Sequence, residues 1–269
     1  MRQLAVAFQF LTIIPIKVRG DVSARDLSRS AVFFPVVGAF QGLLAACASS
    51  LFIMMFPSEI TSGLIIVVLV ISNGGFHLDG LADTFDALAV KSSGNEAIDI
   101  EKRLSVMKEG TTGAIGVVSI VLVILLKYLF INDLLLKAST LAAASFLFLM
   151  AVFSRWVMVP SLCHGTSARK DGLGKAFMDS VGMSTVMYSF LLVVLFCSFI
   201  VWLSLSGYGT KAFALYLFLS ALLYLFSVLA VGFFKRKFGG LTGDNFGAIS
   251  EISEILFLMG VSLWLQRFI

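Results

Sequence analysis

Charged side chains are scarce in this 269-residue chain, where Asp, Glu, Lys and Arg together make up only 13% of the sequence. A soluble domain carries about a quarter charged residues, so this composition excludes a large soluble helical core. Hydrophobic residues reach 59%, and the mean hydropathy is +0.99. Because this excess falls into separate long blocks, it predicts an all-α, polytopic integral membrane protein. No long polar stretch remains, so we expect one membrane domain over residues 1–269.

Cysteine is also rare, and its positions carry no chemical pattern. The chain has three cysteines, at Cys47, Cys163 and Cys197. They share no ligand-like spacing, so they predict neither a disulfide framework nor a thiolate metal site. Two of them lie inside apolar blocks, where a small apolar residue is the usual explanation.

About seven apolar blocks are long enough to be transmembrane helices. They cover residues 31–56, 60–76, 113–131, 138–159, 185–206, 211–234 and 246–267. The opening stretch MRQLAVAFQFLTIIPI is too short for a span, and we expect Met1–Ile14 to form an interfacial or partly inserted helix. It has the charged and apolar regions of a signal peptide but no small-residue cleavage site, so we expect it to be retained.

Lysine and arginine are distributed unevenly between the two ends of these blocks. If the N-terminus is cytoplasmic, only Lys127, Lys137, Lys211 and Arg267 of the twenty basic residues fall at the outer ends. This is a strong positive-inside pattern. Topology therefore explains the net charge of +4, and nothing in the sequence indicates nucleic-acid binding. The inner connections are the long and polar ones, so we expect the functional residues on the cytoplasmic face.

Three aspartates follow an apolar run directly, in the stretch GGFHLDGLADTFDAL at residues 74–88. Asp79, Asp83 and Asp86 are spaced i, i+4, i+7, so on a helix they project from one face. Like charges at this spacing destabilise a helix, and a neighbouring membrane increases the cost. Three explanations are open: a solvated polar face, pairing with basic residues of another loop, or ligation of a hard cation.

A second acidic set lies near the C-terminus, in FGGLTGDNFGAISEISEILFLMG. Asp244, Glu251 and Glu254 share one helical face. The two glutamates fall in the first turns of a span, where exposure to lipid would be too costly. We therefore expect both to face the bundle interior with a partner. The spacing GGxxxD occurs in both stretches, so two acidic helix faces are expected to converge at one membrane interface.

Carboxylate oxygens dominate this combined set, and His77 is the only histidine near it. Oxygen-rich sites suit Mg²⁺, Mn²⁺ or Ca²⁺ better than Zn²⁺. Bound Mg²⁺ would in turn suit a diphosphate substrate.

Phosphate recognition also needs cations and close approach to the backbone. Arg155 lies in the apolar stretch VFSRWVMV, where an arginine needs an anionic partner, and Arg169 and Lys108 lie in inner connections. The paired glycines that include Gly75 and Gly240 would let phosphates approach the main chain.

Together these motifs resemble the cobalamin synthase family, adenosylcobinamide-GDP ribazoletransferase. The resemblance is carried by AFQFLTIIPI, FFPVVGAFQGLL, GGFHLDGLADTFDAL, the MKEGTTGAIG stretch at 107–116, ARKDGLG at 168–174 and GGLTGDNFGAISEISE at 239–254. The chain departs from the family pattern at residues 109–112, where the family commonly has aspartate and often Arg or His. Lys108, Gly113 and Gly116 are retained.

The resemblance implies Mg²⁺-dependent transfer of the adenosylcobinamide-phosphate moiety from adenosylcobinamide-GDP to α-ribazole or α-ribazole 5′-phosphate. GMP would be released and adenosylcobalamin or its 5′-phosphate formed, by a multi-pass enzyme of the bacterial or archaeal plasma (inner) membrane. A homo-oligomer is compatible with it.

The predicted site joins both acidic sets with the cations around them. The expected metal ligands are Asp79, Asp83, Asp86, Asp244, Glu251 and Glu254. Catalytic roles are expected for Asp83, Asp86, Arg155 and Arg169, and substrate contacts for His77, Lys108, Gly75 and Gly240.

Two other functions remain open. A CDP-alcohol phosphatidyltransferase has a signature that partly overlaps DGLAD, but Asp83 stands where that class has arginine. An ion-coupled transporter would also have intramembrane acids, although usually near mid-membrane on broken helices.

Overall fold

The computed structural model describes residues 1–18, 20, 22–169, 173–204 and 209–268. Arg19, Lys170 and part of the 168–174 motif therefore lie outside the described residues. Within the described ranges the chain is helical, with no strand and one isolated β-bridge between Ser167 and Leu241. In chain order the helices are α1 (Arg2–Leu11), α2 (Ala24–Ala31), α3 (Phe34–Phe52), α4 (Ser58–Asn73), α5 (Phe76–Leu88), α6 (Glu96–Val106), α7 (Ala114–Lys137), α8 (Thr140–His164), α9 (Leu173–Met178), α10 (Met183–Ser204), α11 (Gly209–Phe238) and α12 (Gly243–Phe268).

The long helices form the membrane bundle predicted from the sequence. Six of them, α3, α7, α8, α10, α11 and α12, are long and apolar enough to cross a membrane. The helices α4 and α5 form a bent pair that brings the number to seven. The prediction of an all-α polytopic fold is thus confirmed, and each predicted block corresponds to one helix. The boundaries differ most at the C-terminal end of α7, which continues to Lys137.

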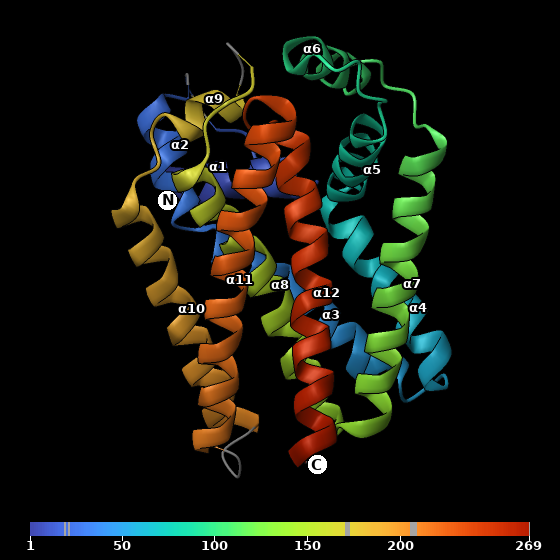
Figure 1. Cartoon of the computed structure of the whole chain (residues 1–269). Coiled ribbons are helices and arrows are strands. Elements are labelled where there is room, and N and C mark those ends of the chain that lie inside the picture. Colours follow the sequence, from blue (N-terminus) through green and yellow to red (C-terminus); the bar gives the residue numbers. More distant parts are fainter. Residues whose placement is uncertain (19, 21, 170–172, 205–208, 269) are drawn as a thin grey trace.

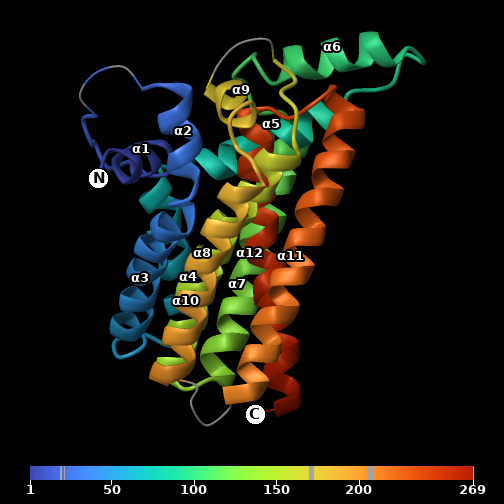
Figure 2. The ribbon, with the colours of Figure 1, turned by 90° about the vertical axis from the view of Figure 1, so that its left-hand side faces the viewer.

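Two consecutive glycines turn the chain between α4 and α5. Gly74 and Gly75 have φ values of 66° and 74°, a left-handed conformation that is costly for residues with a Cβ. The N–H groups of both glycines bond to carbonyls of the last turn of α4. The axis of α5 leaves α4 at 89°, so α5 lies across the end of the bundle (Figure 2).

The short helices gather at one end of the bundle, which we call the site face. Figures 1 and 2 show α1, α2, α5, α6 and α9 at this end and the C-terminus at the opposite one. With 10 residues, α1 is about 15 Å long, half the thickness of the hydrocarbon core. It buries Val6, Ala7 and Leu11 against the bundle, as expected for an interfacial or partly inserted helix.

The helix α8 forms the centre of the bundle. It packs against α3, α10, α11 and α12, and almost all of its residues between Ala142 and Leu162 are buried. A helix that is apolar on every side has no solvent face, so its place inside the bundle follows from its sequence. Any polar side chain on α8 must therefore find its partners inside the protein.

Close packing between α5 and α12 brings the two acidic stretches together. A Cβ on Gly80 of α5 would lie 2.7 Å from the carbonyl oxygen of Asp244. A Cβ on Gly247 of α12 would lie 2.9 Å from the carbonyl oxygen of His77. Each helix thus presents a glycine to the backbone of the other, and small residues of this kind let membrane helices approach closely.

This packing predicts that Gly80→Ala destabilises the protein. The new methyl group must push α5 away from the α12 backbone, with an expected cost of about 1–3 kcal/mol. Thermal unfolding of the detergent-solubilised protein measures the effect. Gly63→Ala on α4 is the matched control, because nothing lies within 4 Å of its added Cβ. Equal unfolding temperatures for the two variants would contradict close packing at Gly80.

Candidate functional site

Four aspartates of the site face influence one another electrostatically. Asp79, Asp83 and Asp86 lie on α5, which crosses the site face, and Asp244 lies in the first turn of α12. The pKa of Asp83 is raised to about 6, first by burial and then by the charges of Asp79, Asp244 and Asp86. The two acidic helix faces therefore converge, as the GGxxxD spacing suggested.

Arg169 is the cation that opposes this negative charge. Its Nη2 lies 3.5 Å from Oδ2 of Asp244, and its charge lowers the pKa of Asp83. The guanidinium Nε is buried and has no hydrogen-bond partner in the described part of the chain. Arg169 thus keeps donor capacity beside a cluster whose negative charge exceeds its own.

A short backbone pairing positions Arg169. The N–H of Ala168 donates to the carbonyl of Leu241 at 2.9 Å, and the N–H of Leu241 donates to the carbonyl of Thr166 at 2.8 Å. A Cβ on Gly240 would lie 2.5 Å from both the Thr166 carbonyl oxygen and the Ala168 nitrogen. The structure therefore gives Gly240 a packing role, because this pairing leaves no room for a side chain there.

Asn245 joins the start of α12 to α5. Its side-chain oxygen accepts from the N–H of Thr242 at 2.9 Å, and its amide nitrogen donates to the hydroxyl of Thr84 at 3.1 Å. Asn245 and Thr84 are fully buried. These bonds fix the register of the two helices that carry the aspartates. No pattern in the sequence indicated this role.

Asp86 is occupied by backbone donors at the start of α7. Its carboxylate oxygens accept from the N–H of Gly113 at 2.6 Å and from the N–H of Gly116 at 2.8 Å. An acid at a helix N-terminus satisfies otherwise unpaired N–H groups. Asp86 thereby ties the segment that contains exposed Lys108 to the site face. The sequence placed Asp86 among the metal and catalytic residues, whereas the structure assigns it this anchoring contact.

Glu251 and Glu254 lie deeper in the bundle than the aspartates. At 1.5 Å per residue, Glu251 is roughly 10 Å along α12 from Asp244. The Nζ of Lys127 on α7 lies 2.5 Å from an oxygen of each glutamate, and both glutamates are buried. The expectation that they face the interior with a partner is confirmed. The metal role predicted for them receives no support, because a cation already neutralises them.

Arg155 completes this buried network from the centre of α8. Its Nη1 lies 3.3 Å from Oε1 of Glu254 and also donates to the hydroxyls of Ser154 and Ser250, while its Nε donates to Gln41 at 2.8 Å. With 1% of its side chain exposed, Arg155 lies inside the bundle. The sequence assigned it to catalysis, and the structure makes it a partner of Glu254.

Lys127 is the network member that the sequence prediction misplaced. We expected it near the outer end of its span, but α7 runs from Ala114 to Lys137 and places it in the middle of the helix. A lysine inside an apolar run, together with two glutamates in need of a partner, was the signal that could have identified it.

His77 and Gly75 contribute to the architecture of the site. His77 is buried against Gly247, and its Nδ1 lies 3.5 Å from the side-chain nitrogen of Asn73. Gly75 is part of the α4–α5 turn, with open space where a Cβ would be. The structure thus shows a buried histidine and a turn glycine at the positions for which we expected substrate contacts.

The aspartates of the site face fit Mg²⁺ by their chemistry. Among the described residues, no three His, Cys, Asp or Glu side chains are already arranged to hold a metal ion. Mg²⁺ does not require such a cage, because it is usually bound through one or two carboxylates, water and substrate phosphates. Mutually repelling oxygen donors at Asp79, Asp83 and Asp244, with Arg169 as their cation, match that mode of binding.

Comparison with known proteins identifies the family. The family model described as cobalamin-5-phosphate synthase matches residues 3–262. The chain belongs to the cobalamin-5-phosphate synthase family. It is therefore an enzyme of the transferase class, and its family is named for cobalamin-5-phosphate synthesis and not for phosphatidyl transfer or ion transport.

Curated relatives of this family match over nearly their whole length. The adenosylcobinamide-GDP ribazoletransferase of Thermodesulfovibrio yellowstonii is 35% identical over 275 residues, which cover 99% of both chains. That of Geotalea daltonii is 38% identical over 260 residues, and that of Desulfitobacterium hafniense is 32% identical over 263. No solved structure matches this chain.

The buried network predicts that Lys127→Met strongly destabilises the protein. The substitution leaves two buried glutamates facing a single arginine, and breaking a buried ion pair costs about 3–5 kcal/mol. Thermal unfolding in detergent should show this loss. The double variant Lys127→Met/Glu251→Gln should recover part of it, because it removes the uncompensated charge. Additive effects of the two substitutions would show that Lys127 and Glu251 do not interact.

Proposed function

We propose that this protein transfers the adenosylcobinamide-phosphate moiety from adenosylcobinamide-GDP to α-ribazole or α-ribazole 5′-phosphate, with release of GMP. The observation that carries the proposal is the cluster of Asp79, Asp83 and Asp244 beside Arg169 at one end of a membrane bundle. The names of the relatives, which match almost the whole chain, indicate the donor and the acceptor class. The cluster is suited to a diphosphate, which the GDP part of the donor supplies.

We assign Mg²⁺ binding to Asp79, Asp83 and Asp244. When bound, the ion would neutralise the diphosphate and stabilise negative charge on the departing GMP. Glu251, Glu254 and Asp86 are left out of this assignment. The two glutamates are paired with Lys127 and Arg155, and Asp86 with the backbone of α7.

In the transfer step one bond to phosphorus forms and another breaks, while side chains of the protein take up the proton and bind the phosphate oxygens. The ribazole hydroxyl oxygen forms a bond to the phosphorus attached to cobinamide, and the bond from that phosphorus to the GMP oxygen breaks. The hydroxyl proton passes to a carboxylate oxygen of the cluster that the metal ion does not occupy, because a base must lie within hydrogen-bond reach of the proton that it takes. Arg169, whose contact to Asp244 is 3.5 Å, donates to the phosphate oxygens.

We further propose that the site face is cytoplasmic. Lys137, Lys211 and Arg267 lie at the opposite end, whereas α6 and the end of α11 bring Arg103, Lys235, Arg236 and Lys237 to the site face. Lys127, which we had counted with the outer residues, is buried in the bundle and drops out of the comparison. The positive-inside rule then favours this orientation, in a bacterial or archaeal plasma membrane.

The test of this function is GMP release from adenosylcobinamide-GDP and α-ribazole by the purified protein, with and without Mg²⁺. Asp83→Asn and Asp244→Asn should each abolish Mg²⁺-dependent release, a loss of at least about 100-fold for a group acting in the transition state. Asp179→Asn is the matched control, because within the described ranges this exposed aspartate forms an ion pair with Lys175 alone. Both site variants should still insert and unfold cooperatively. Retained release in both would refute the site.

Metal affinity should depend on pH through Asp83. Its pKa is raised to about 6, so protons compete with the metal at a higher pH than for an ordinary aspartate. Mn²⁺ binding, followed by electron paramagnetic resonance, should therefore weaken as the pH falls from 7 to 5. Asp83→Asn should flatten this dependence over the same interval. An affinity that stays constant down to pH 5 in the wild-type protein would contradict the assignment of Asp83.

A further inference from the structure

A polar cavity and an apolar groove meet on α11, and none of the four aspartates of the site face lines either of them. The cavity has a volume of about 450 Å³ and lies between α6 and the end of α11. The groove has a volume of about 280 Å³ and lies between α5, α11 and α12. Phe233 lines both, so the two spaces adjoin at its ring. The proposed transfer reaction uses neither of them.

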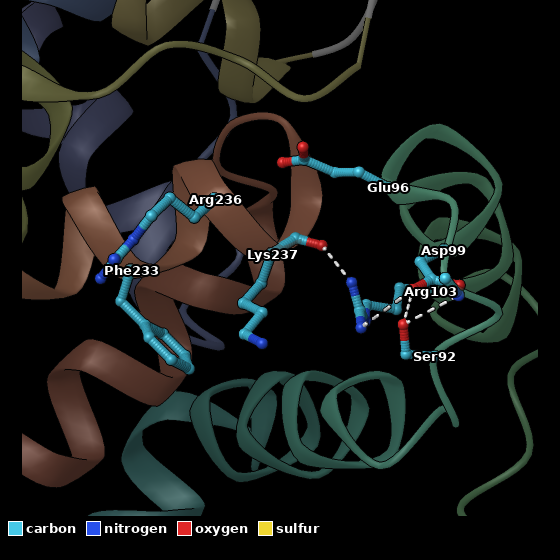
Figure 3. Close-up of a pocket in the computed structure, with 8 residues that line it drawn as sticks. Ser92, Glu96, Asp99, Arg103, Phe233, Arg236 and Lys237 are labelled. Carbon is cyan, nitrogen blue, oxygen red and sulfur yellow. Dashed lines mark hydrogen bonds and ion pairs between the residues drawn. The ribbon is translucent and has the colours of Figure 1, made fainter.

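The polar cavity carries a small excess of positive charge. Figure 3 shows Glu96 and Arg103 facing the end of α11, where Lys237 extends from the helix in the same direction as the Phe233 ring. Its charged lining residues are Arg103, Arg236, Lys237, Glu96 and Asp99. This set has a net charge of one positive unit, which complements one phosphodiester.

The wall formed by α6 is held by contacts that do not involve the Lys237 ammonium. Arg103 donates from Nη1 to the backbone carbonyl of Lys237 at 3.1 Å, and its Nη2 lies 4.0 Å from Asp99. Asp99 in turn accepts from Ser92 and Ser93, which hold its pKa at about 2. Removing the Lys237 side chain would therefore keep α6 in place, because Arg103 binds its backbone.

The adjoining groove is apolar. Its walls include Phe85 and Leu88 of α5, Leu229 and Ala230 of α11, and Ile252 of α12. Along α11, Leu225, Leu229, Phe233 and Lys237 recur at intervals of four residues, so they form one oblique stripe that shifts around the helix by about 40° per step. Its three apolar members are exposed on a helix long enough to span a membrane. The stripe thus passes from apolar to cationic in the direction of the site face.

We propose that this stripe binds a phospholipid with an anionic headgroup. An acyl chain lies in the groove against Leu229 and Phe233, and the headgroup phosphate lies in the cavity against Lys237 and Arg236. A soluble anion would leave the apolar groove uncovered, and a purely apolar ligand would leave the charges of the cavity unused. An amphipathic molecule with one phosphate satisfies both, and a cation near a membrane surface contributes about 1 kcal/mol to binding such lipids.

Native mass spectrometry of the full-length, delipidated protein tests this site, with phosphatidylglycerol as the probe and phosphatidylcholine for comparison. The wild-type protein should retain one phosphatidylglycerol more tightly than phosphatidylcholine. Lys237→Gln should weaken the binding of phosphatidylglycerol about fivefold, and Arg236→Gln/Lys237→Gln roughly 30-fold. Ala230→Trp, which fills the groove without changing charge, should also weaken it.

Lys235→Gln is the matched control. It removes the same charge from the same basic run, but Lys235 does not line the cavity. All variants should unfold at the wild-type temperature in lipid-free detergent, so that a loss of binding is not a loss of fold. Equal effects of Lys235→Gln and Lys237→Gln would overturn the proposal in favour of general surface attraction. Displacement of the lipid by inorganic phosphate or GDP at similar concentrations would overturn it in favour of a soluble anion. Neither outcome depends on the transfer reaction.

Discussion

The ion pairs that Lys127 makes with Glu251 and Glu254 are the interaction on which the rest of the structure depends. They join α7 to α12 inside an apolar bundle, and Arg155 extends the network to the central helix α8. Charges in such surroundings persist only when they are matched and hydrogen-bonded, so the four residues fix the depth and rotation of α12. The position of Asp244 at the site face follows from that, since it lies on the same face of the same helix.

The two acidic sets differ in how their charge is compensated. The deep glutamates have two buried cations and form a closed network, which suits a structural role. Among the aspartates of the site face, Asp244 has Arg169 at 3.5 Å, and burial together with the repulsion between the aspartates raises the pKa of Asp83 to about 6. That remaining negative charge is the physical basis for proposing a divalent cation and a diphosphate there. Residues whose charge is compensated by buried partners position the helices, whereas residues whose charge is not compensated can act on a substrate.

Four glycines set the position of α5 and its aspartates relative to the other helices of the bundle. The turn at Gly74 and Gly75 directs α5 across the end of the bundle, and Gly80 and Gly247 let α5 and α12 approach to backbone contact. Without the turn α5 would continue α4, and without the contact its aspartates would lie away from Asp244. The same arrangement leaves α11 with a stripe that changes from apolar to cationic, where the membrane and the site face meet.

The sequence by itself determined the helical membrane fold, the approximate spans and the acidic face on each of two helices, because these follow from hydropathy and from residue spacing along single helices. Only the tertiary structure decided which charges are partners. Lys127 and Glu251 are far apart in the chain, and no local pattern shows that α7 faces α12 at that depth. For the same reason the sequence predicted catalytic roles for Arg155 and Asp86, whereas in the folded protein Arg155 contacts Glu254 and Asp86 contacts the start of α7. The sequence shows which side chains are charged, but neighbours from other helices determine whether a charged group is already paired or can still bind a substrate or metal ion.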